Sequence, residues 1–110
     1  MNRKYLGEFE EIVLLIVSML DGHAYGVSIT HEIIEQTNRS VRLNQVHSAL
    51  HRLEGKGMVA SKMGGATQER GGRRKRIFTI TAYGRQALCD IQEVRSKLWE
   101  KQPIKPMTQS

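Results

Sequence analysis

Apolar residues recur at helical spacing near the start of the chain. They return every three or four positions between residues 7 and 20, and the repeating members are Phe9, Ile12, Val13, Ile16, Met19 and Leu20. The unbroken apolar run 12–17 is also compatible with a buried strand, but the glutamates before it suit the positive end of a helix dipole and favour a helix. Leu14, Leu15 and Val17 make this helix apolar almost all round, which predicts a central place in the core or partial cover by another subunit.

Two more helices are expected before the pattern changes. Turn residues at 21–22 separate the first helix from a second one over 25–37, whose apolar members are Val27, Ile29, Ile33 and Ile34. A third helix is expected over 44–56, where Gly57 would supply the left-handed residue that ends it. The apolar residues of this third helix fall at i, i+3, i+4 and i+7, and they are Val46, Ala49, Leu50 and Leu53.

A β-hairpin and a final helix are expected after Gly57. Residues 58–63 and 76–80 alternate as strands do, and glycine pairs bracket the polar loop between them. Thr81 can cap a helix that runs to about residue 101, and Pro103 and Pro106 end it. Four apolar residues of this helix have the spacing of a coiled-coil seam, namely Ala87, Ile91, Val94 and Leu98.

Three helices followed by a β-hairpin form the winged helix-turn-helix arrangement. The predicted fold class is therefore α+β and mainly α, with a C-terminal dimerisation helix. We expect the winged helix-turn-helix domain over residues 1–80, the dimerisation helix over 81–102 and a tail over 103–110.

Charge is divided unevenly along the chain. The whole chain has 17 Lys and Arg against 11 Asp and Glu, a formal net charge of +6. Residues 1–37 hold two basic and six acidic side chains, a sum of −4, whereas residues 38–110 hold fifteen and five, a sum of +10. A basic region of this kind favours a polyanionic partner, and nucleic acid is the commonest one. Charge alone is equally compatible with a solvated basic surface that has no target.

The third helix would turn a polar face away from the core. Its outward side chains would be Asn44, Gln45, His47, Ser48, His51 and Arg52. Asn and Gln can pair with adenine in the major groove, Arg with guanine and Ser with several bases. The N-terminal residues of such a helix lie deepest in the groove. We therefore expect the first four of these residues to read bases and the last two to contact phosphates or base edges, although ordinary solvent-facing residues would look the same.

The tip of the hairpin is strongly basic. Between residues 62 and 76, Glu69 stands alone against Lys62, Arg70, Arg73, Arg74, Lys75 and Arg76. Like charges packed this closely repel one another, so the cluster is favourable only beside a polyanion. A basic wing suits the minor groove or flanking phosphates, where it adds affinity and little sequence information. Together with the third helix, the wing predicts binding of duplex DNA.

Five segments between about residues 6 and 90 match one family in order. They are Leu6-Gly7-Glu8-Phe9-Glu10-Glu11, Ala24-Tyr25-Gly26-Val27, Leu50-His51-Arg52-Leu53-Glu54-Gly55-Lys56-Gly57 preceded by Val46, Arg70-Gly71-Gly72-Arg73-Arg74-Lys75-Arg76, and Thr79-Ile80-Thr81-Ala82-Tyr83-Gly84. In these segments the chain resembles the PadR family of bacterial transcriptional regulators, in its compact branch with a short C-terminal helix. The family usually has Tyr where this chain has His47, and commonly Ser where it has Arg42, so DNA contacts do not transfer from relatives at these two positions.

The resemblance implies a homodimer in which the C-terminal helix packs against the partner subunit, often on its N-terminal helix. The residues expected at this interface are Phe9, Ala87, Ile91, Val94, Leu98 and Trp99. The resemblance also implies repression of nearby genes, relieved in some members by a small-molecule effector. In the compact branch such an effector can lie between subunits, which makes Trp99 a candidate for stacking on a planar effector as well as for anchoring the interface.

Few other residues carry chemistry. His47 and His51 have the spacing of a zinc-binding pair, but no third ligand lies nearby in the sequence, so neither a metal nor another cofactor is expected. Cys89 is the only cysteine, which leaves no intramolecular disulfide and favours a small apolar residue over a redox switch. No nucleophilic residue set or phosphate-binding glycine loop is recognisable, so an enzyme is not expected.

The sequence predicts a cytoplasmic protein that represses transcription as a DNA-bound homodimer. The N-terminus does not have the pattern of a signal peptide, and the longest apolar run, six residues, is far below the ~20 that span a bilayer, so no membrane contact is expected. One alternative is a winged module whose basic hairpin binds an acidic protein, but protein interfaces favour apolar and aromatic anchors over a polar helix face. RNA binding is a further alternative, against which the shortage of exposed aromatic residues counts.

Overall fold

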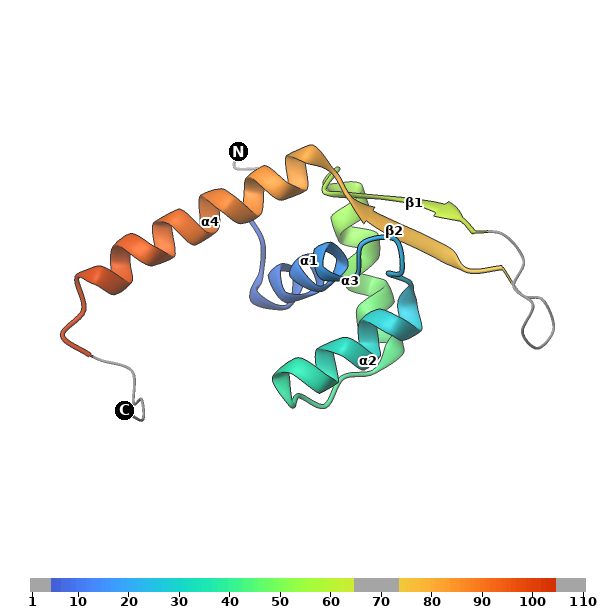
Figure 1. Ribbon diagram of the computed structural model, residues 1–110, viewed down its shortest axis with the longest axis horizontal. Helices are drawn as coiled ribbons and strands as arrows, with labels where there is room; N and C mark the ends of the chain where they lie inside the picture. The colour runs from blue at the N-terminus through green and yellow to red at the C-terminus, as the bar shows by residue number, and fades with distance from the viewer. Residues whose placement is uncertain (1–4, 65–73, 105–110) are drawn as a thin grey trace.

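The computed structural model describes residues 5–64 and 74–104. Its elements follow in the order α1 Glu8–Leu20, α2 Gly26–Thr37, α3 Leu43–Gly55, β1 Val59–Met63, β2 Arg76–Ile80 and α4 Ala82–Glu100. Helices α1 to α3 form the body, the β1–β2 hairpin extends from one side of it and α4 extends from the other (Figure 1). The predicted fold class is confirmed, and the ends of the predicted elements agree with the structure to within one residue.

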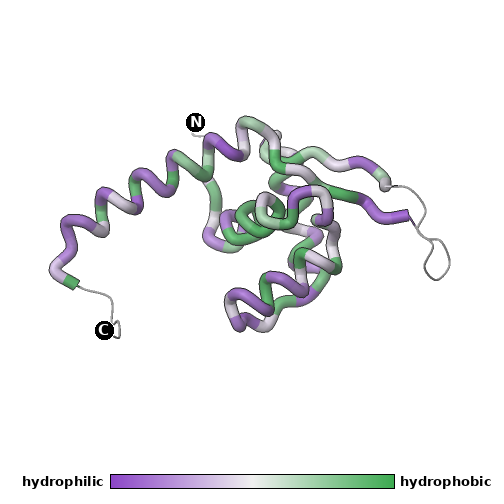
Figure 2. Tube along the Cα trace, in the orientation of Figure 1, coloured by the Kyte–Doolittle hydropathy of each residue, from purple (hydrophilic) through white to green (hydrophobic). Residues whose placement is uncertain are grey.

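The core forms where α1, α2 and α3 meet. The predicted apolar stripe of α3 is confirmed, since all four of its members, Val46, Ala49, Leu50 and Leu53, are buried. Helix α1 is the central element and is apolar along most of its length (Figure 2), with Val13, Leu14 and Val17 almost completely buried. Burial of this apolar surface is the main favourable contribution to folding in a domain of this size.

The buried faces of α1 and α2 differ from the stripes that the pattern predicted. Met19 is 55% exposed although it was expected in the core. Of the four apolar residues predicted for α2, Ile29 and Ile33 are buried, whereas Val27 and Ile34 lie at the surface and help to line an open apolar groove of about 510 Å³. When a helix has two adjacent apolar stripes, either stripe can face the core. Packing against the neighbouring helices decides which of the two is buried.

The hairpin is joined to the body by backbone hydrogen bonds. Strands β1 and β2 pair antiparallel, from Val59 opposite Ile80 to Met63 opposite Arg76. The N–H of Phe78 on β2 donates to the carbonyl of Ala24 in the α1–α2 loop at 2.8 Å. Gly57 adopts φ +78°, so the left-handed end predicted for α3 is confirmed.

The joint between the hairpin and α4 is close-packed. The hydroxyl of Thr81 accepts a hydrogen bond from the N–H of Gly84 at 3.0 Å, which confirms Thr81 as the N-cap of α4. The same hydroxyl donates to the carbonyl of Gly57 at 2.7 Å. A Cβ at Gly84 would overlap the carbonyl oxygen of Met58, so this turn of α4 requires glycine.

Helix α4 is divided between the body and the solvent. Ala87 is completely buried and Ile91 packs partly against the core, whereas Val94, Leu98 and Trp99 are exposed. Ala87 therefore lies inside the chain's own core, which removes it from the interface in which the sequence placed it. Within residues 5–64 and 74–104, neither α4 nor another helix combines the length and the apolarity that crossing a bilayer requires.

A buried carboxylate connects α1 to α3. The Glu10 side chain is only 10% exposed, and its two oxygens accept hydrogen bonds at 2.6 Å from Nε of Arg52 and from Nζ of Lys56. Burial by itself raises the pKa of Glu10, but the hydrogen bonds and positive charges of Lys56 and Arg52 outweigh it and hold the pKa below its ordinary value. The ion pair thus favours the ionised carboxylate and ties the C-terminal half of α3 to α1.

Substitution of Gly84 by Ala is expected to destabilise the protein strongly. The added methyl group must displace the backbone at Met58, at a cost of about 3 kcal/mol, which corresponds to a fall of roughly 10 °C or more in Tm. Gly55→Ala is the matched control, because a Cβ there meets no atom within 4 Å, and its Tm should stay within a few degrees of the parent value. Equal Tm values for the two variants in a thermal unfolding experiment would contradict the close packing at Gly84.

The Glu10 ion pair is expected to make the free energy of unfolding depend on pH. A carboxylate whose pKa is lowered by folding contributes stability that is present above its unfolded pKa of about 4.3 and is lost as the pH falls through the lower folded pKa. Glu10→Gln should therefore reduce the free energy of unfolding at pH 7 by about 1–2 kcal/mol, and the difference from the parent should diminish as the pH falls below about 4 and through the lower folded pKa.

Urea unfolding at a series of pH values measures this difference. Glu8→Gln is the control, because the Glu8–Arg39 ion pair is exposed and such pairs contribute little. A deficit of Glu10→Gln that stayed constant from pH 7 to pH 3 would show that the charge on Glu10 is not what stabilises the fold.

Candidate nucleic-acid interface

The polar residues of α3 lie on the surface, opposite its buried stripe. All six side chains expected there are exposed, and they are Asn44, Gln45, His47, Ser48, His51 and Arg52. Asn44, Ser48 and His51 make no side-chain hydrogen bond or ion pair with other described residues, so their polar groups are available to a ligand. Helix α3 therefore offers a surface of hydrogen-bonding side chains of the kind that reads base edges.

Gln45 has a local role that the sequence interpretation missed. Its Oε1 accepts a hydrogen bond from the backbone N–H of Arg42 at 2.8 Å, one residue before α3 begins. This contact is the return half of a capping box, in which the side chain at the third helical position binds the N-cap N–H. Gln45 could pair with adenine through both its amide oxygen and its amide nitrogen only by giving up this bond, so Asn44 is the better placed of the two residues.

His47 is held at the crossing of α2 and α3. A Cβ at Gly26 would come within 2.8 Å of Cε1 and 2.9 Å of Nε2 of the His47 ring. Gly26 therefore allows the imidazole to lie across the first turn of α2. This contact orients the ring at the position where the resemblance expects a Tyr.

Basic residues directly before β2 hold the hairpin in place. Nζ of Lys75 lies 4.3 Å from the centre of the Tyr25 ring, a cation–π contact that connects the residue before β2 to the N-cap residue of α2. Nε of Arg74 donates to the carbonyl of Gly64 across the hairpin at 2.9 Å. Lys62 and Arg76 are exposed on the two strands, whereas Arg70 and Arg73 lie outside the described residues. The described cations thus lie at the end of the hairpin next to its loop, and Lys75 reaches back to Tyr25.

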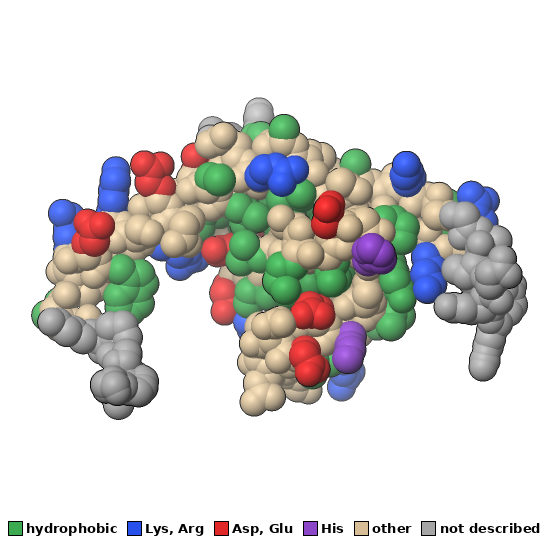
Figure 3. Space-filling view, in the orientation of Figure 1, with side chains coloured by type: hydrophobic (Ala, Val, Ile, Leu, Met, Phe, Trp, Pro, Cys, Tyr) green, Lys and Arg blue, Asp and Glu red, His purple; other side chains and the backbone are tan. Residues whose placement is uncertain are grey.

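Arg76 extends this network toward α3. Its Nη1 donates to Oγ of Ser61 at 3.0 Å, and that hydroxyl donates to Glu54 at 2.9 Å. In the space-filling view, Lys and Arg side chains (blue) lie along the hairpin and toward the far end of α4 (Figure 3). The hairpin and α3 therefore form one connected surface, in which α3 supplies neutral polar groups and the hairpin supplies positive charge.

Arg52 is engaged within the protein, although the sequence predicted a phosphate or base-edge contact for it. Its Nε donates to Glu10, as described above, and its side chain is 51% exposed. The sequence did hold a signal that Glu10 needs a cation, though not which one, because Glu10 lies three, four and seven residues before Val13, Leu14 and Val17 and so belongs to the most buried stripe of α1. A carboxylate on such a stripe needs a cation or hydrogen-bond donors beside it.

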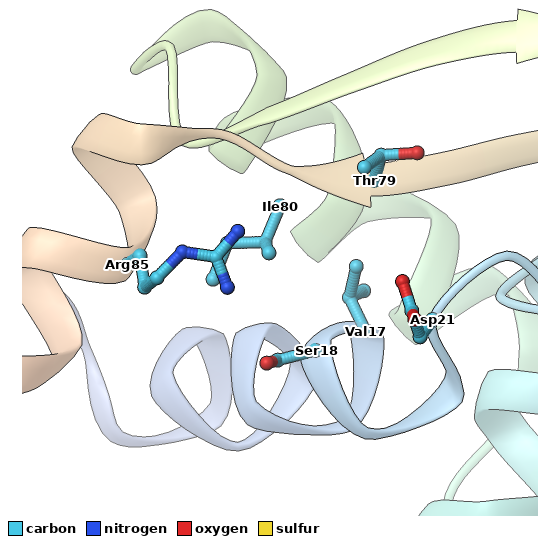
Figure 4. A pocket seen from close by; sticks show the side chains of 6 residues that line it. All are labelled: Val17, Ser18, Asp21, Thr79, Ile80 and Arg85. Atoms are coloured by element: carbon cyan, nitrogen blue, oxygen red, sulfur yellow. The ribbon is translucent and has the colours of Figure 1, made fainter.

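A surface depression lies where α1, β2 and α4 meet. It has a volume of about 350 Å³ and is lined by Val17, Ser18, Asp21, Thr79, Ile80 and Arg85 (Figure 4). The guanidinium of Arg85 and the carboxylate of Asp21 stand on opposite sides of Val17 and Ile80 (Figure 4). Trp99 does not line it, so the aromatic residue expected to stack on an effector is separate from this depression.

Comparison with known proteins agrees with this geometry. The family model described as the transcriptional regulator PadR-like family matches residues 13–90. A PadR family transcription regulator from Clostridium difficile R20291 is similar in structure, with a TM-score of 0.65 and 20% identity, over 86% of this chain and 93% of that one. No curated protein matches the sequence.

Two further solved structures have the same fold. A PadR-like transcription factor from Bacteroides fragilis gives a TM-score of 0.69 and 16% identity, over 84% of each chain. A PadR family transcriptional regulator from Eggerthella lenta DSM 2243 gives a TM-score of 0.64 and 21% identity, over 84% of this chain and 80% of that one. The family match covers most of the chain and extends from α1 into α4. The chain belongs to the PadR-like family, whose members are DNA-binding transcriptional regulators and not enzymes.

Proposed function

We propose that this chain binds specific sites on double-stranded DNA as a homodimer and represses the genes beside them, in the cytoplasm. The observation that carries the proposal is the exposed polar face of α3 beside the basic residues near the loop end of the hairpin. Asn44 and Ser48 stand near the N-terminal end of α3, the end that enters a major groove most deeply in helix-turn-helix proteins. In this proposal they read bases, and the wing binds the sugar-phosphate backbone.

Exposed apolar side chains support a homodimer. Val94, Leu98 and Trp99 are each more than half exposed on the part of α4 that extends beyond the body (Figure 1). Leu15 and Met19 form a second exposed apolar patch on α1. Large apolar side chains gathered in this way mark an interaction surface. In a twofold dimer, α4 of one subunit covers α1 of the other, and the two α3 helices read half-sites about 10–10.5 base pairs apart or at a multiple of that spacing.

Phe9 contributes less to this interface than the sequence suggested. Its ring is half-buried against the chain's own core, and the guanidinium carbon of Arg39 lies 5.9 Å from the ring centre. The interface of the proposal therefore consists mainly of Val94, Leu98 and Trp99 on α4 and of Leu15 and Met19 on α1.

The proposal includes release from DNA by a small planar effector that stacks on Trp99. Its side chain is 59% exposed and lies close to the C-terminal end of α4, so in the proposed dimer it would stand at the subunit boundary. An effector bound there would alter the angle between the subunits and hence the distance between the two α3 helices. As Trp99 is the only tryptophan, its fluorescence reports directly on such a ligand.

Substitutions on α3 and on the hairpin are expected to have different effects on DNA binding. Asn44→Ala should weaken binding to the operator by about 1–3 kcal/mol and leave binding to unrelated duplexes unchanged, because it removes a base contact. Arg74→Ala should weaken binding to all duplexes alike and reduce the slope of log K against log salt concentration by ~0.9, because it removes a phosphate contact.

Operator fragments selected from the source genome by binding, together with a scrambled duplex, provide the measurement. Lys101→Ala is the control for loss of a positive charge away from the hairpin, and it should change neither affinity. If Asn44→Ala and Arg74→Ala lower the ratio of operator affinity to scrambled-duplex affinity equally, then α3 and the hairpin do not have the separate roles proposed here. If the parent protein binds no fragment but captures an acidic protein, the alternative of a protein-interaction module replaces DNA binding.

Leu98→Asp is expected to convert the dimer into monomers, because it places a charge in the centre of the apolar seam. Sedimentation equilibrium of the full chain measures the change, which should raise the dimer dissociation constant at least about a hundredfold. Cys89→Asp introduces the same charge at an exposed position on the opposite side of α4 from Leu98, about three turns before Trp99, and should leave the dimer intact. A dimer that persists in Leu98→Asp would exclude α4 as the interface.

A further inference from the structure

The first turn of α1 carries three carboxylates, and each binds a cation from a different part of the chain. Glu8 pairs with Arg39, which follows α2, at 3.1 Å. Glu10 pairs with Arg52 and Lys56 at the C-terminal end of α3 at 2.6 Å, and Glu11 pairs with Arg95 on α4 at 2.8 Å. The sequence interpretation related these glutamates only to the helix dipole, so their pairing with three other segments is information that the tertiary structure adds.

The Glu10 pair differs from the other two in its location. Arg52 lies four residues after Ser48 and seven after Gln45, which places it on the outward face of α3. Its guanidinium nevertheless points back to Glu10, and Nζ of Lys56 binds the same carboxylate and the carbonyl of Tyr5 at 3.1 Å. Two cations of α3 are therefore held on the protein by one carboxylate of α1.

The exposures of these groups show how the restraint can work. The Arg52 side chain is 51% exposed and that of Lys56 is 31% exposed, whereas that of Glu10 is 10% exposed. A DNA phosphate could therefore reach the two cations but could not easily displace the buried carboxylate. Because a short charge-assisted hydrogen bond is strong where water is excluded, Glu10 competes well with a phosphate for both of them.

We propose that Glu10 is a specificity-determining residue, which withholds Arg52 and Lys56 from the DNA backbone and so suppresses binding to unrelated sequences. The inference rests on the proposed DNA binding. Non-specific affinity depends on the number of phosphates that cations neutralise, whereas specific affinity also depends on base contacts. When two cations are held on the protein, the non-specific affinity falls and the base contacts of α3 are unchanged. Specificity, the ratio of the two affinities, rises as a result.

Removal of the charge on Glu10 tests the proposal. In Glu10→Gln the two cations are released, so binding to a scrambled duplex at 50 mM salt should tighten roughly threefold to tenfold, and its salt slope should steepen by ~0.9 to 1.8. Operator affinity should rise less, which lowers the specificity ratio. In the double variant Glu10→Gln and Arg52→Gln, about half of the increase in the salt slope should be lost, because one of the two released cations is removed. A role of Glu10 in stability alone would weaken both kinds of binding together and leave the salt slope unchanged.

Glu8→Gln is the matched control, because it makes the same change of charge on the same turn but releases Arg39, which does not belong to α3. If Glu8→Gln tightens non-specific binding as much as Glu10→Gln does, net charge is the cause and the proposal is overturned.

A second variant keeps the test valid if Glu10→Gln fails to fold. Arg52→Gln in the parent protein should leave the non-specific salt slope almost unchanged, because that guanidinium is already withheld from DNA. A decrease of ~0.9, as expected for Arg74→Ala, would overturn the proposal. Failure of the proposed function is distinguishable from failure of this inference, since in the former case the parent protein itself binds neither duplex.

Discussion

The arrangement of this protein depends on the burial of one side of α3. Val46, Leu50 and Leu53 are almost completely buried between α1 and α2, and a helix fixed along one stripe must present the opposite stripe to solvent. The polar face that carries the candidate interface is therefore a direct consequence of core packing. Loss of this packing would change the direction of every side chain on that face at once.

Two glycines allow close contacts that set the positions of the elements around α3. Gly26 lets the His47 ring lie across the start of α2, and Gly84 lets the start of α4 lie on the backbone of Met58. The bonds of Thr81 to Gly57 and Gly84 then fix the direction in which α4 leaves the body. The hairpin is fixed at the other side by the Phe78–Ala24 hydrogen bond. A rigid body with two extensions in defined directions is what a regulator needs if it is to span two DNA half-sites.

Ion pairs on the first turn of α1 connect these parts. Glu10 binds α3 and Glu11 binds α4, and the two residues are adjacent in the chain. A displacement of α4 would therefore act on the same turn that holds the C-terminal half of α3. The Glu10 contact is the stronger of the two, because Glu10 binds two cations at 2.6 Å whereas Glu11 binds one at 2.8 Å.

The order and boundaries of the elements could be predicted from the sequence because they depend on local signals. The period of the α3 stripe, the left-handed Gly57 and the Thr81 cap all act within a few residues, and the structure confirms each of them. The exposed location of the six polar residues of α3 followed from the same periodicity.

Contacts between distant residues were decided only by the tertiary structure. Periodicity did not reveal which of two apolar stripes on α2 faces the core, and Val27 proved to be exposed. It also did not reveal that Arg52 is paired with Glu10 or that Lys75 lies over Tyr25. The physical reason is that a helical pattern determines which side chains share a face, whereas the partner of a charged or apolar group depends on how the helices pack against one another. The sequence by itself thus determined the surface that α3 presents, and the packing determined which of its cations remain available to a ligand.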